Sequence, residues 1–151
     1  MDKNFTSGWG QNENGNVFFI HHRVRYSDTD KMDMVYHGSY IPMLEAARVD
    51  TLREIGWVYN EMEKSGLLLP VVDLSVKYFE PARYDQILRI ESHVLERPTS
   101  RLKFSFSIFH EETLLVSSEV CLAFVDANSS RPTRAPEALI ESLEKHSLIH
   151  D

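Results

Sequence analysis

The sequence predicts an α+β domain in which one long helix packs against a curved antiparallel sheet of about five strands, with a second helix near the C-terminus. Three observations lead to this prediction. An early stretch is rich in β-branched and aromatic residues, one later segment has helical periodicity, and apolar residues then alternate with polar ones through several segments. Short turns separate those segments, and short connections join antiparallel neighbours.

The N-terminal half supplies the first strand and the long helix. Residues 17–26 (VFFIHHRVRY) favour a strand, whereas residues 1–16 are rich in Gly and Asn and are expected to form a disordered lead-in. Apolar residues recur at helical spacing over residues 39–56. Ser39 is suited to cap the start of this helix, and Gly56 is suited to end it.

The C-terminal half supplies the other strands. A short helix is expected over residues 59–64. Period-two alternation then predicts strands at residues 72–78, 86–96, 102–108 and 114–125. The last helix is expected over residues 135–145. A single domain would therefore span residues 17–145, followed by a tail over residues 146–151.

Composition restricts the class of protein. The 151 residues fit one domain, and a net charge of −7 argues against nucleic acid as the main partner. The lone cysteine, Cys121, cannot form an internal disulfide and is expected to be buried in an alternating apolar stretch. No apolar run approaches the ~20 residues of a membrane-spanning helix, and the N-terminus lacks the apolar core of a signal peptide. We therefore expect a cytoplasmic protein.

Titratable side chains gather in RYSDTDKMDMVYHGSY, between the first strand and the long helix. They are Tyr26, Asp28, Asp30, Asp33, Tyr36 and His37. A helix N-terminus presents unpaired N–H groups and a partial positive charge, which favour an anion or a polarised carbonyl oxygen. A nearby carboxylate can act on the same carbonyl as a general base or as a nucleophile. The pattern therefore favours acyl transfer.

Other interpretations of this segment compete. The helix dipole alone favours acidic residues before a helix. A calcium loop beginning at Asp28 would need Gly at position six and Glu at position twelve, where the chain has Asp33 and Ser39. His21 and His22 are adjacent on a strand and point to opposite faces, so they cannot hold one zinc ion together. We expect neither a metal nor a cofactor.

RYSDTDKMDMVYHGSYIPMLEAAR resembles the signature of the 4-hydroxybenzoyl-CoA thioesterase-like family, particularly its acyl-CoA thioesterase branch, and VDLSVKYFEPARYDQILRIES is similar to that family as well. The resemblance covers residues 17–127. It implies a hot-dog fold, in which an antiparallel sheet wraps a long helix and chains pair into homodimers or homotetramers. It also implies that acyl-CoA binds at the subunit interface and that its thioester is hydrolysed without a metal.

The same resemblance implies roles for individual residues. Asp30 matches the catalytic aspartate, His37 matches the histidine of this branch, and Tyr26 matches its strand tyrosine. A backbone N–H at or near His37 would polarise the thioester carbonyl. Many members have Gly where this chain has Asp33, which tolerates unusual backbone angles less well than Gly. A second carboxylate there would also raise the proton affinity of Asp30.

The sequence therefore predicts an acyl-CoA thioesterase in which Asp30 is either the nucleophile or the general base. Arg101 and Lys103 alternate on the polar face of their strand and are candidates to bind the CoA phosphates, although an ordinary solvated face explains them as well. Two other functions stay open. One is a non-catalytic module that binds acyl-CoA or acyl-carrier protein, and the other is a hot-dog hydratase or dehydratase that uses Glu45.

Overall fold

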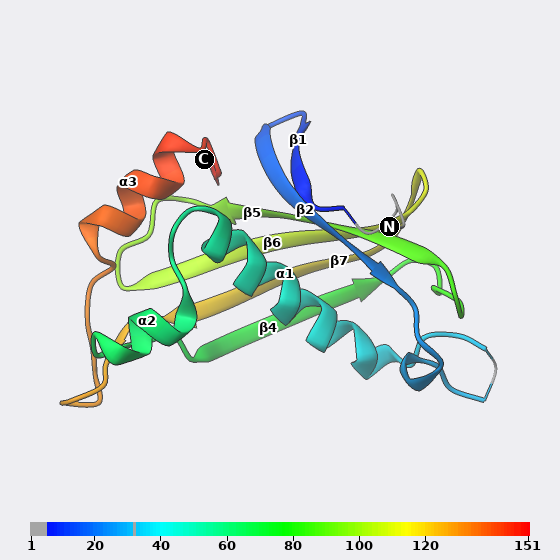
Figure 1. Ribbon diagram of the computed structural model, residues 1–151, viewed down its shortest axis with the longest axis horizontal. Helices are drawn as coiled ribbons and strands as arrows, with labels where there is room; N and C mark the ends of the chain where they lie inside the picture. Colours follow the sequence, from blue (N-terminus) through cyan, green and yellow to red (C-terminus); the bar gives the residue numbers. More distant parts are fainter. Residues whose placement is uncertain (1–5, 32) are drawn as a thin grey trace.

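The computed structural model describes residues 6–31 and 33–151. Its central element is α1 (Tyr40–Glu54), which lies against one face of a large, mostly antiparallel sheet (Figure 1). The strand order is β1-β2-β5-β6-β7-β4, and β10 pairs with β5 outside this path. The predicted architecture of one long helix on an antiparallel sheet is confirmed. The predicted number of about five strands is too low, because this sheet has seven.

The large sheet consists of β1 (Gly8–Asn12), β2 (Gly15–Arg23), β4 (Val71–Tyr78), β5 (Ile87–Leu95), β6 (Arg101–His110), β7 (Thr113–Ala123) and β10 (Ile149–His150). A small sheet contains β3 (Leu67–Leu68), β8 (Val125–Asp126) and β9 (Arg131–Pro132). The other helices are α2 (Tyr59–Lys64), α3 (Glu137–Lys145) and the 3-10 turns η2 (Tyr26–Asp28) and η3 (His37–Ser39). Within the described residues, no helix has the length and apolar character needed to cross a membrane.

The N-terminal segment differs from the disordered lead-in expected over residues 1–16, of which residues 1–5 lie outside the described residues. From Gly8 the chain forms β1, which pairs with β2 in antiparallel fashion. Trp9 of this strand packs edge-on against Phe18, with ring centroids 5.2 Å apart. The expectation was wrong because backbone groups make the pairing, and a Gly- and Asn-rich segment has those groups too.

The C-terminal segment, expected to be a tail over residues 146–151, also belongs to the sheet. Leu148 is fully buried, and β10 pairs in parallel with the end of β5. The ring of His150 stacks on that of His93, with centroids 3.9 Å apart and planes 14° apart. His150 Nε2 donates a hydrogen bond to the backbone oxygen of Asn16 at 2.8 Å, which ties the C-terminal segment to β2.

The apolar core lies between α1 and the sheet. The helix buries the face formed by Tyr40, Met43, Leu44, Ala47, Arg48, Thr51 and Leu52. On β6, buried and more exposed residues alternate as predicted, and Phe104 and Phe106 are almost inaccessible to solvent. Cys121, expected in the core, is half-buried on the other face of β7. The two residues beside it, Val120 and Leu122, occupy the core positions.

Both ends of α1 fall where the sequence predicts them. Gly56 follows the helix with a φ of +96°, a left-handed conformation that Gly adopts without strain. The N–H of Trp57 bonds to the carbonyl of Leu52 at 2.8 Å, which completes a Schellman motif. At the other end, Ser39 precedes the helix but makes no capping hydrogen bond from its side chain. Its backbone is already helical, because η3 leads directly into α1.

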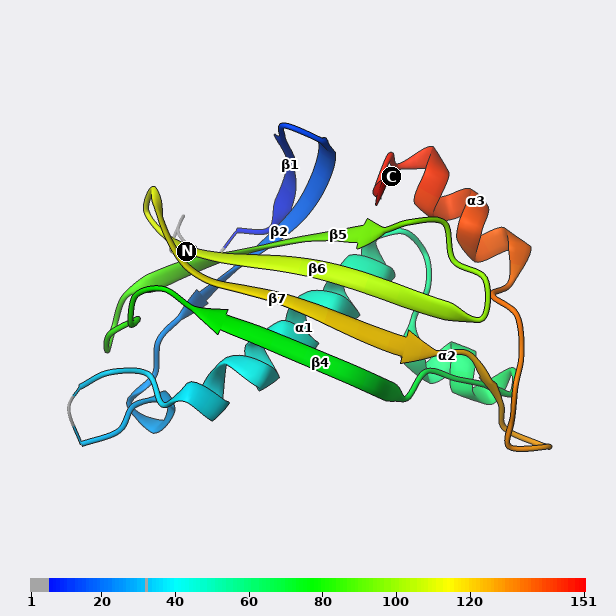
Figure 2. The same cartoon turned by 180° about the vertical axis from the view of Figure 1, so that it is seen from behind.

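One edge and one face of the sheet remain open. The first residues of α1 lie near η3, and the helix packs mainly over β2 and β5, which leaves β4 uncovered. Every residue of β4 except Val76 is exposed, although the strand pairs with β7 along its inner side, with one irregularity between Val71 and Asp73. Figure 2, seen from behind, shows that no helix crosses the opposite face of β4 to β7.

The stacked histidines make stability depend on pH. Burial and the adjacent His150 lower the pKa of His93 from its ordinary value of 6.5 to about 4. Between these values the unfolded chain binds a proton that the folded chain does not. We therefore predict that the free energy of unfolding decreases as the pH falls from about 6.5 to about 4. The full shift corresponds to about 3 kcal/mol, and solvent access to the half-buried ring makes the effect smaller.

Urea unfolding at about pH 7 and about pH 4.5 measures this dependence. The substitution His93→Phe keeps a ring against His150 but cannot bind a proton, so it should flatten the dependence. His110→Phe, on a histidine outside this stack, is the control and should keep the wild-type dependence. An equal loss of stability between about pH 7 and about pH 4.5 in the wild type and in His93→Phe would contradict the prediction.

Candidate active site

The loop between β2 and α1 folds back on itself and carries most of the predicted site. The N–H of Asp30 bonds to the carbonyl of Met34 at 2.8 Å, and Thr29 forms an antiparallel bridge with Val35. The loop is therefore hairpin-like, and its outgoing and returning limbs lie side by side. As a result, Asp30 lies next to the segment that leads into His37 at the start of η3. The side chains of Asp30 and His37 are both exposed.

Asp28 connects the two limbs of this loop. Its Oδ2 accepts hydrogen bonds at 2.9 Å from His22 Nε2 and from the backbone N–H of Arg25. Its backbone oxygen accepts a hydrogen bond from the N–H of Tyr36, also at 2.9 Å. Burial raises the pKa of Asp28, but the Arg25 amide and the His22 ring outweigh burial, so the pKa lies below its ordinary value of 3.8. Asp28 is therefore an ionised structural carboxylate at neutral pH.

The segment after β4 braces the loop from the other side. The N–H of Val35 bonds to the carbonyl of Ala82 at 2.9 Å, and the N–H of Ala82 bonds to the Tyr40 hydroxyl at 3.1 Å. The Tyr78 hydroxyl donates to the carbonyl of His37 at 2.9 Å. Burial raises the pKa of Tyr40, which keeps its phenol neutral. Residues from YFEPARY thus fix the start of α1, although they lie about forty positions further along the chain.

Two backbone N–H groups are available at this helix start. The amides of Tyr36 and Ser39 are already bonded to the carbonyls of Asp28 and Tyr36. Those of His37 and Gly38 have no hydrogen-bond acceptor among the described residues. They lie at the positive end of the helix dipole, where they can polarise a carbonyl oxygen. A Cβ atom on Gly38 would approach the Tyr36 ring to 2.9 Å, so a side chain here would require the exposed Tyr36 ring to shift.

An open, mostly apolar cavity of about 380 Å³ lies beside these amides. Its lining residues are Met34, Val35, His37, Tyr40, Tyr78, Phe79, Glu80 and Pro81. The volume is in the range of small-ligand pockets. The ring of His37 packs against that of Tyr36, with centroids 4.1 Å apart. The sequence analysis did not identify Tyr78, Phe79 or Pro81 as site residues. The alternation of apolar and polar residues breaks where β4 ends at an aromatic pair, and this break was the signal that could have identified them.

Asp33, which stands where many members of the family have Gly, adopts a left-handed backbone conformation. Its φ is +65°, and its N–H bonds to the carbonyl of Asp30 at 3.4 Å. Asp is among the residues that tolerate this region best after Gly. The tight turn of the loop is therefore compatible with the residue found here.

Tyr26 lies away from the cavity. It begins η2, its side chain is 81% exposed, and its ring meets that of Tyr84 edge-on with centroids 6.0 Å apart. In a single chain its hydroxyl therefore faces solvent and not the amides of His37 and Gly38.

Arg101 and Lys103 are also distant from the loop within one chain. Arg101 pairs with Ala123 at one end of β7, whereas Tyr78, beside the cavity, pairs with Val116 towards the other end. Lys103 forms an ion pair with Glu96, whose Oε1 lies 2.7 Å from the Lys103 Nζ. The sequence could not show this separation, because alternation reveals the face of a strand but not which of its ends adjoins a given loop.

His21 and His22 point to opposite faces of β2, as predicted. His21 pairs with Arg89 and its Nδ1 lies 2.6 Å from the backbone oxygen of Thr6, whereas His22 pairs with buried Leu88 and bonds to Asp28. In the part of the chain that the structure describes, no three His, Cys, Asp or Glu side chains gather as metal ligands would.

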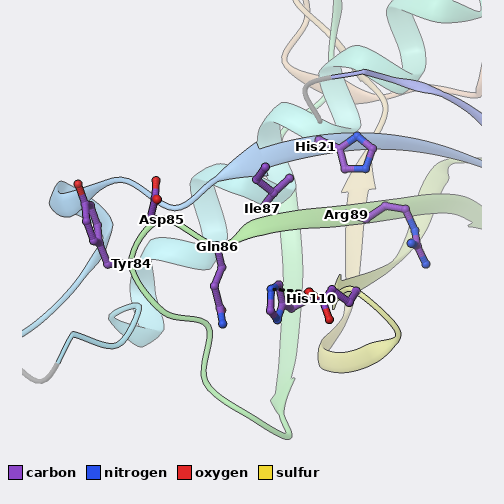
Figure 3. A pocket seen from close by; sticks show the side chains of 8 residues that line it. His21, Tyr84, Asp85, Gln86, Ile87, Arg89 and His110 are labelled. Carbon is purple, nitrogen blue, oxygen red and sulfur yellow. Dashed lines mark ion pairs between the residues drawn. The ribbon is translucent and has the colours of Figure 1, made fainter. Parts of the chain in front are cut away.

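A larger cavity, of about 550 Å³, lies elsewhere (Figure 3). It is lined by His21, Tyr84, Asp85, Gln86, Ile87, Arg89, His110 and Glu111. Its main cation is already engaged, because Arg89 pairs with Glu91 at 2.9 Å and lies over the Phe109 ring at 4.8 Å. Asp30 is a lining residue of neither cavity, but His37 and the start of η3 border only the smaller one. The smaller cavity at the head of α1 is therefore the candidate active site.

Comparisons with known proteins agree with this architecture and this loop. Residues 24–143 match the model of the thioesterase-like superfamily. The acyl-CoA thioester hydrolase YbgC of Escherichia coli O6:H1 is 31% identical over 124 residues, which cover 82% of this chain and 92% of that protein.

Solved structures give the same result. The DHNA-CoA thioesterase of Staphylococcus aureus has a TM-score of 0.78 at 28% identity and covers 84% of this chain and 88% of its own. The TT1821 protein of Thermus thermophilus has a TM-score of 0.79 at 30% identity and covers 85% of this chain and 98% of its own. The matched region contains the Asp30 loop, α1 and the strands β4 to β7. The resemblance seen in the sequence is confirmed, and the chain belongs to the thioesterase-like superfamily.

Proposed function

We propose that this chain hydrolyses acyl-CoA thioesters to a carboxylic acid and free CoA, with Asp30 as the reactive carboxylate. One observation carries the proposal. The loop that holds Asp30 leads directly into the two free amides of His37 and Gly38, beside a mostly apolar cavity. The names of YbgC and of the S. aureus structure support the class of substrate, since each is a hydrolase of a CoA thioester.

The proposed reaction uses groups on both sides of the thioester. The amides of His37 and Gly38 stabilise the oxyanion that forms on the carbonyl oxygen. Asp30 either attacks the carbonyl carbon, giving an anhydride that water then cleaves, or removes a proton from the attacking water. In both routes the carbon–sulfur bond breaks and CoA leaves as the thiol. His37 borders the cavity and would orient the acyl group there.

A second copy of the chain is proposed to complete the site. The edge of β4 has free backbone groups and exposed apolar side chains, namely Val71, Val72, Leu74, Tyr78 and the adjoining Phe79. An edge of this kind normally pairs or is covered. Two copies related by a two-fold axis would pair their β4 strands in antiparallel fashion. Both α1 helices would then lie on the same face of the joined sheet.

Such a homodimer would also cover the exposed Asp30 and His37 side chains. Antiparallel pairing brings the Val71 end of one β4 strand beside the Tyr78 end of the other. The Arg101 end of one sheet would then lie at the same end of the joined sheet as the cavity of the other copy, with Arg101 and Lys103 on the face opposite α1. Arg101 and Lys103 are therefore proposed to contact the CoA phosphates only from a second copy and only around the end of the sheet.

The first prediction from the proposed function concerns the charge on Asp30. The substitution Asp30→Asn keeps the size of the side chain but removes the base or nucleophile. It should reduce thiol release from acyl-CoA by at least about a hundredfold. Release of free thiol is measured across short, long and aromatic acyl-CoAs, because the type of acyl chain is not defined by one subunit.

Asp33→Asn is the matched control on the same loop, since it removes one negative charge and Asn tolerates the left-handed backbone. It should keep most of the activity. An Asp30→Asn variant as active as the wild type would remove Asp30 from the mechanism. Tight binding of acyl-CoA without thiol release would favour the binding module, and loss of enoyl absorbance without thiol release would favour a hydratase.

The second prediction concerns the β4 edge. Leu74 is 36% exposed on the helix side of this edge strand, and Leu74→Lys should place a charge in the proposed dimer interface. We expect light scattering to show twice the chain mass, or a multiple of that, for the wild type and the mass of one chain for Leu74→Lys. Thiol release should fall with dissociation.

Leu114→Lys is the control, because Leu114 is 37% exposed but lies on β7, which is not an edge strand. It should leave both the mass and the activity unchanged. A wild-type protein with the mass of a single chain and full activity would contradict the shared site.

A further inference from the structure

We infer that His22 is a positioning residue for the proposed reaction, because it fixes the loop that carries Asp30 to the sheet through Asp28. The inference rests on the proposed hydrolysis and adds a residue to it. His22 does not approach the cavity at the head of α1 and is not among its lining residues. It would act on catalysis only through the position of the loop.

The His22–Asp28 hydrogen bond joins the loop to a rigid element. His22 belongs to β2, and its cross-strand partner Leu88 is completely buried on the same face as Ile20. The side chains of His22 and Asp28 are only 19% and 13% exposed. A hydrogen bond to a carboxylate in such a poorly solvated place is stronger than its counterpart in water.

Asp28 links His22 to both parts of the site, namely the free amides and Asp30. Its backbone oxygen receives the N–H of Tyr36, and the next residue, His37, supplies the first free amide. Asp30 lies two residues after Asp28 and is bonded back to Met34. A displacement of Asp28 would therefore change the distance between the carboxylate and the amides that must act on one carbonyl. Misplacement by about 1 Å is enough to reduce a rate by about a hundredfold.

Two other groups contact the Asp28 carboxylate. The amide of Arg25 follows Val24, whose backbone bonds to Gln86 and Asp85, so it holds the start of the loop beside the sheet through the main chain and not through a side chain. The Arg25 side chain is 71% exposed, and its Nε is 3.9 Å from Asp28 Oδ2, which makes this a weak surface ion pair. His22 is therefore the side chain that ties the Asp28 carboxylate to the sheet.

Three variants test this role. His22→Leu removes the donor and suits the apolar surroundings of Leu88, so the fold should be retained. His22→Gln keeps an N–H donor near the position of Nε2. His21→Leu is the matched control, because it changes the same residue type one position earlier, on the opposite face and outside the candidate active site.

Hydrogen exchange measures the position of the loop directly. The amides of Asp30 and Tyr36 both donate hydrogen bonds within the loop. Their protection should fall about tenfold or more in His22→Leu, while the amides of β6 keep theirs. Protection should be largely restored in His22→Gln and unchanged in His21→Leu. Wild-type protection of Asp30 and Tyr36 in His22→Leu would overturn the inference.

Kinetics give the second readout. His22→Leu should lower kcat by about tenfold to a hundredfold with little change in KM, because the cavity and its lining stay intact. His22→Gln should recover most of kcat. Equal kcat values in all three variants would also overturn the positioning role. If the wild type releases no thiol from any acyl-CoA, the proposed hydrolysis fails, and hydrogen exchange alone still decides whether His22 anchors the loop.

Discussion

The burial of one face of α1 against the sheet is the interaction on which the rest of the structure depends. Seven residues of this helix are buried, and the alternating side chains of β5, β6 and β7 fill the space opposite them. Removal of this much apolar surface from water is the main force that holds the two layers together. It also fixes where the helix begins. The free amides of His37 and Gly38 are therefore held by the core, together with the hydrogen bonds that Tyr78 and Asp28 make to this segment.

The loop before α1 combines two carboxylates with different tasks. Asp28 is buried enough to need partners, and its hydrogen bonds from β2 and from its own turn keep it ionised and fixed. Asp30 is exposed and is positioned through its backbone. A rigid, paired carboxylate thus supports a neighbour that faces solvent and is proposed to act on the substrate. Precise placement on a supported loop is a general requirement of catalytic groups.

Local patterns predicted the parts of the fold that they control. The helix over residues 39–56 and the strand over residues 102–108 were clear because buried faces repeat with a fixed period. Asp30 lies beside the segment that leads into His37 because both belong to one loop that folds back on itself. The strands β1 and β10 have no apolar period of their own, since partners made elsewhere in the chain supply their stability. Tyr78 reaches His37 only through the sheet topology, which one sequence does not reveal.

The two edge strands of the sheet differ in how readily a strand of another chain can pair with them. On one side, β1 is a short Gly-containing strand, and Gly and short length both make an edge a poor template for a further chain. On the other side, β4 is an eight-residue edge strand that exposes the apolar side chains of Val71, Val72, Leu74 and Tyr78. If β4 pairs with β4 of a second copy, the long exposed edge strand is no longer available for pairing with further chains. In the proposed homodimer, pairing through β4 would thus leave only the short β1 edges outside, which do not favour growth into open-ended fibrils.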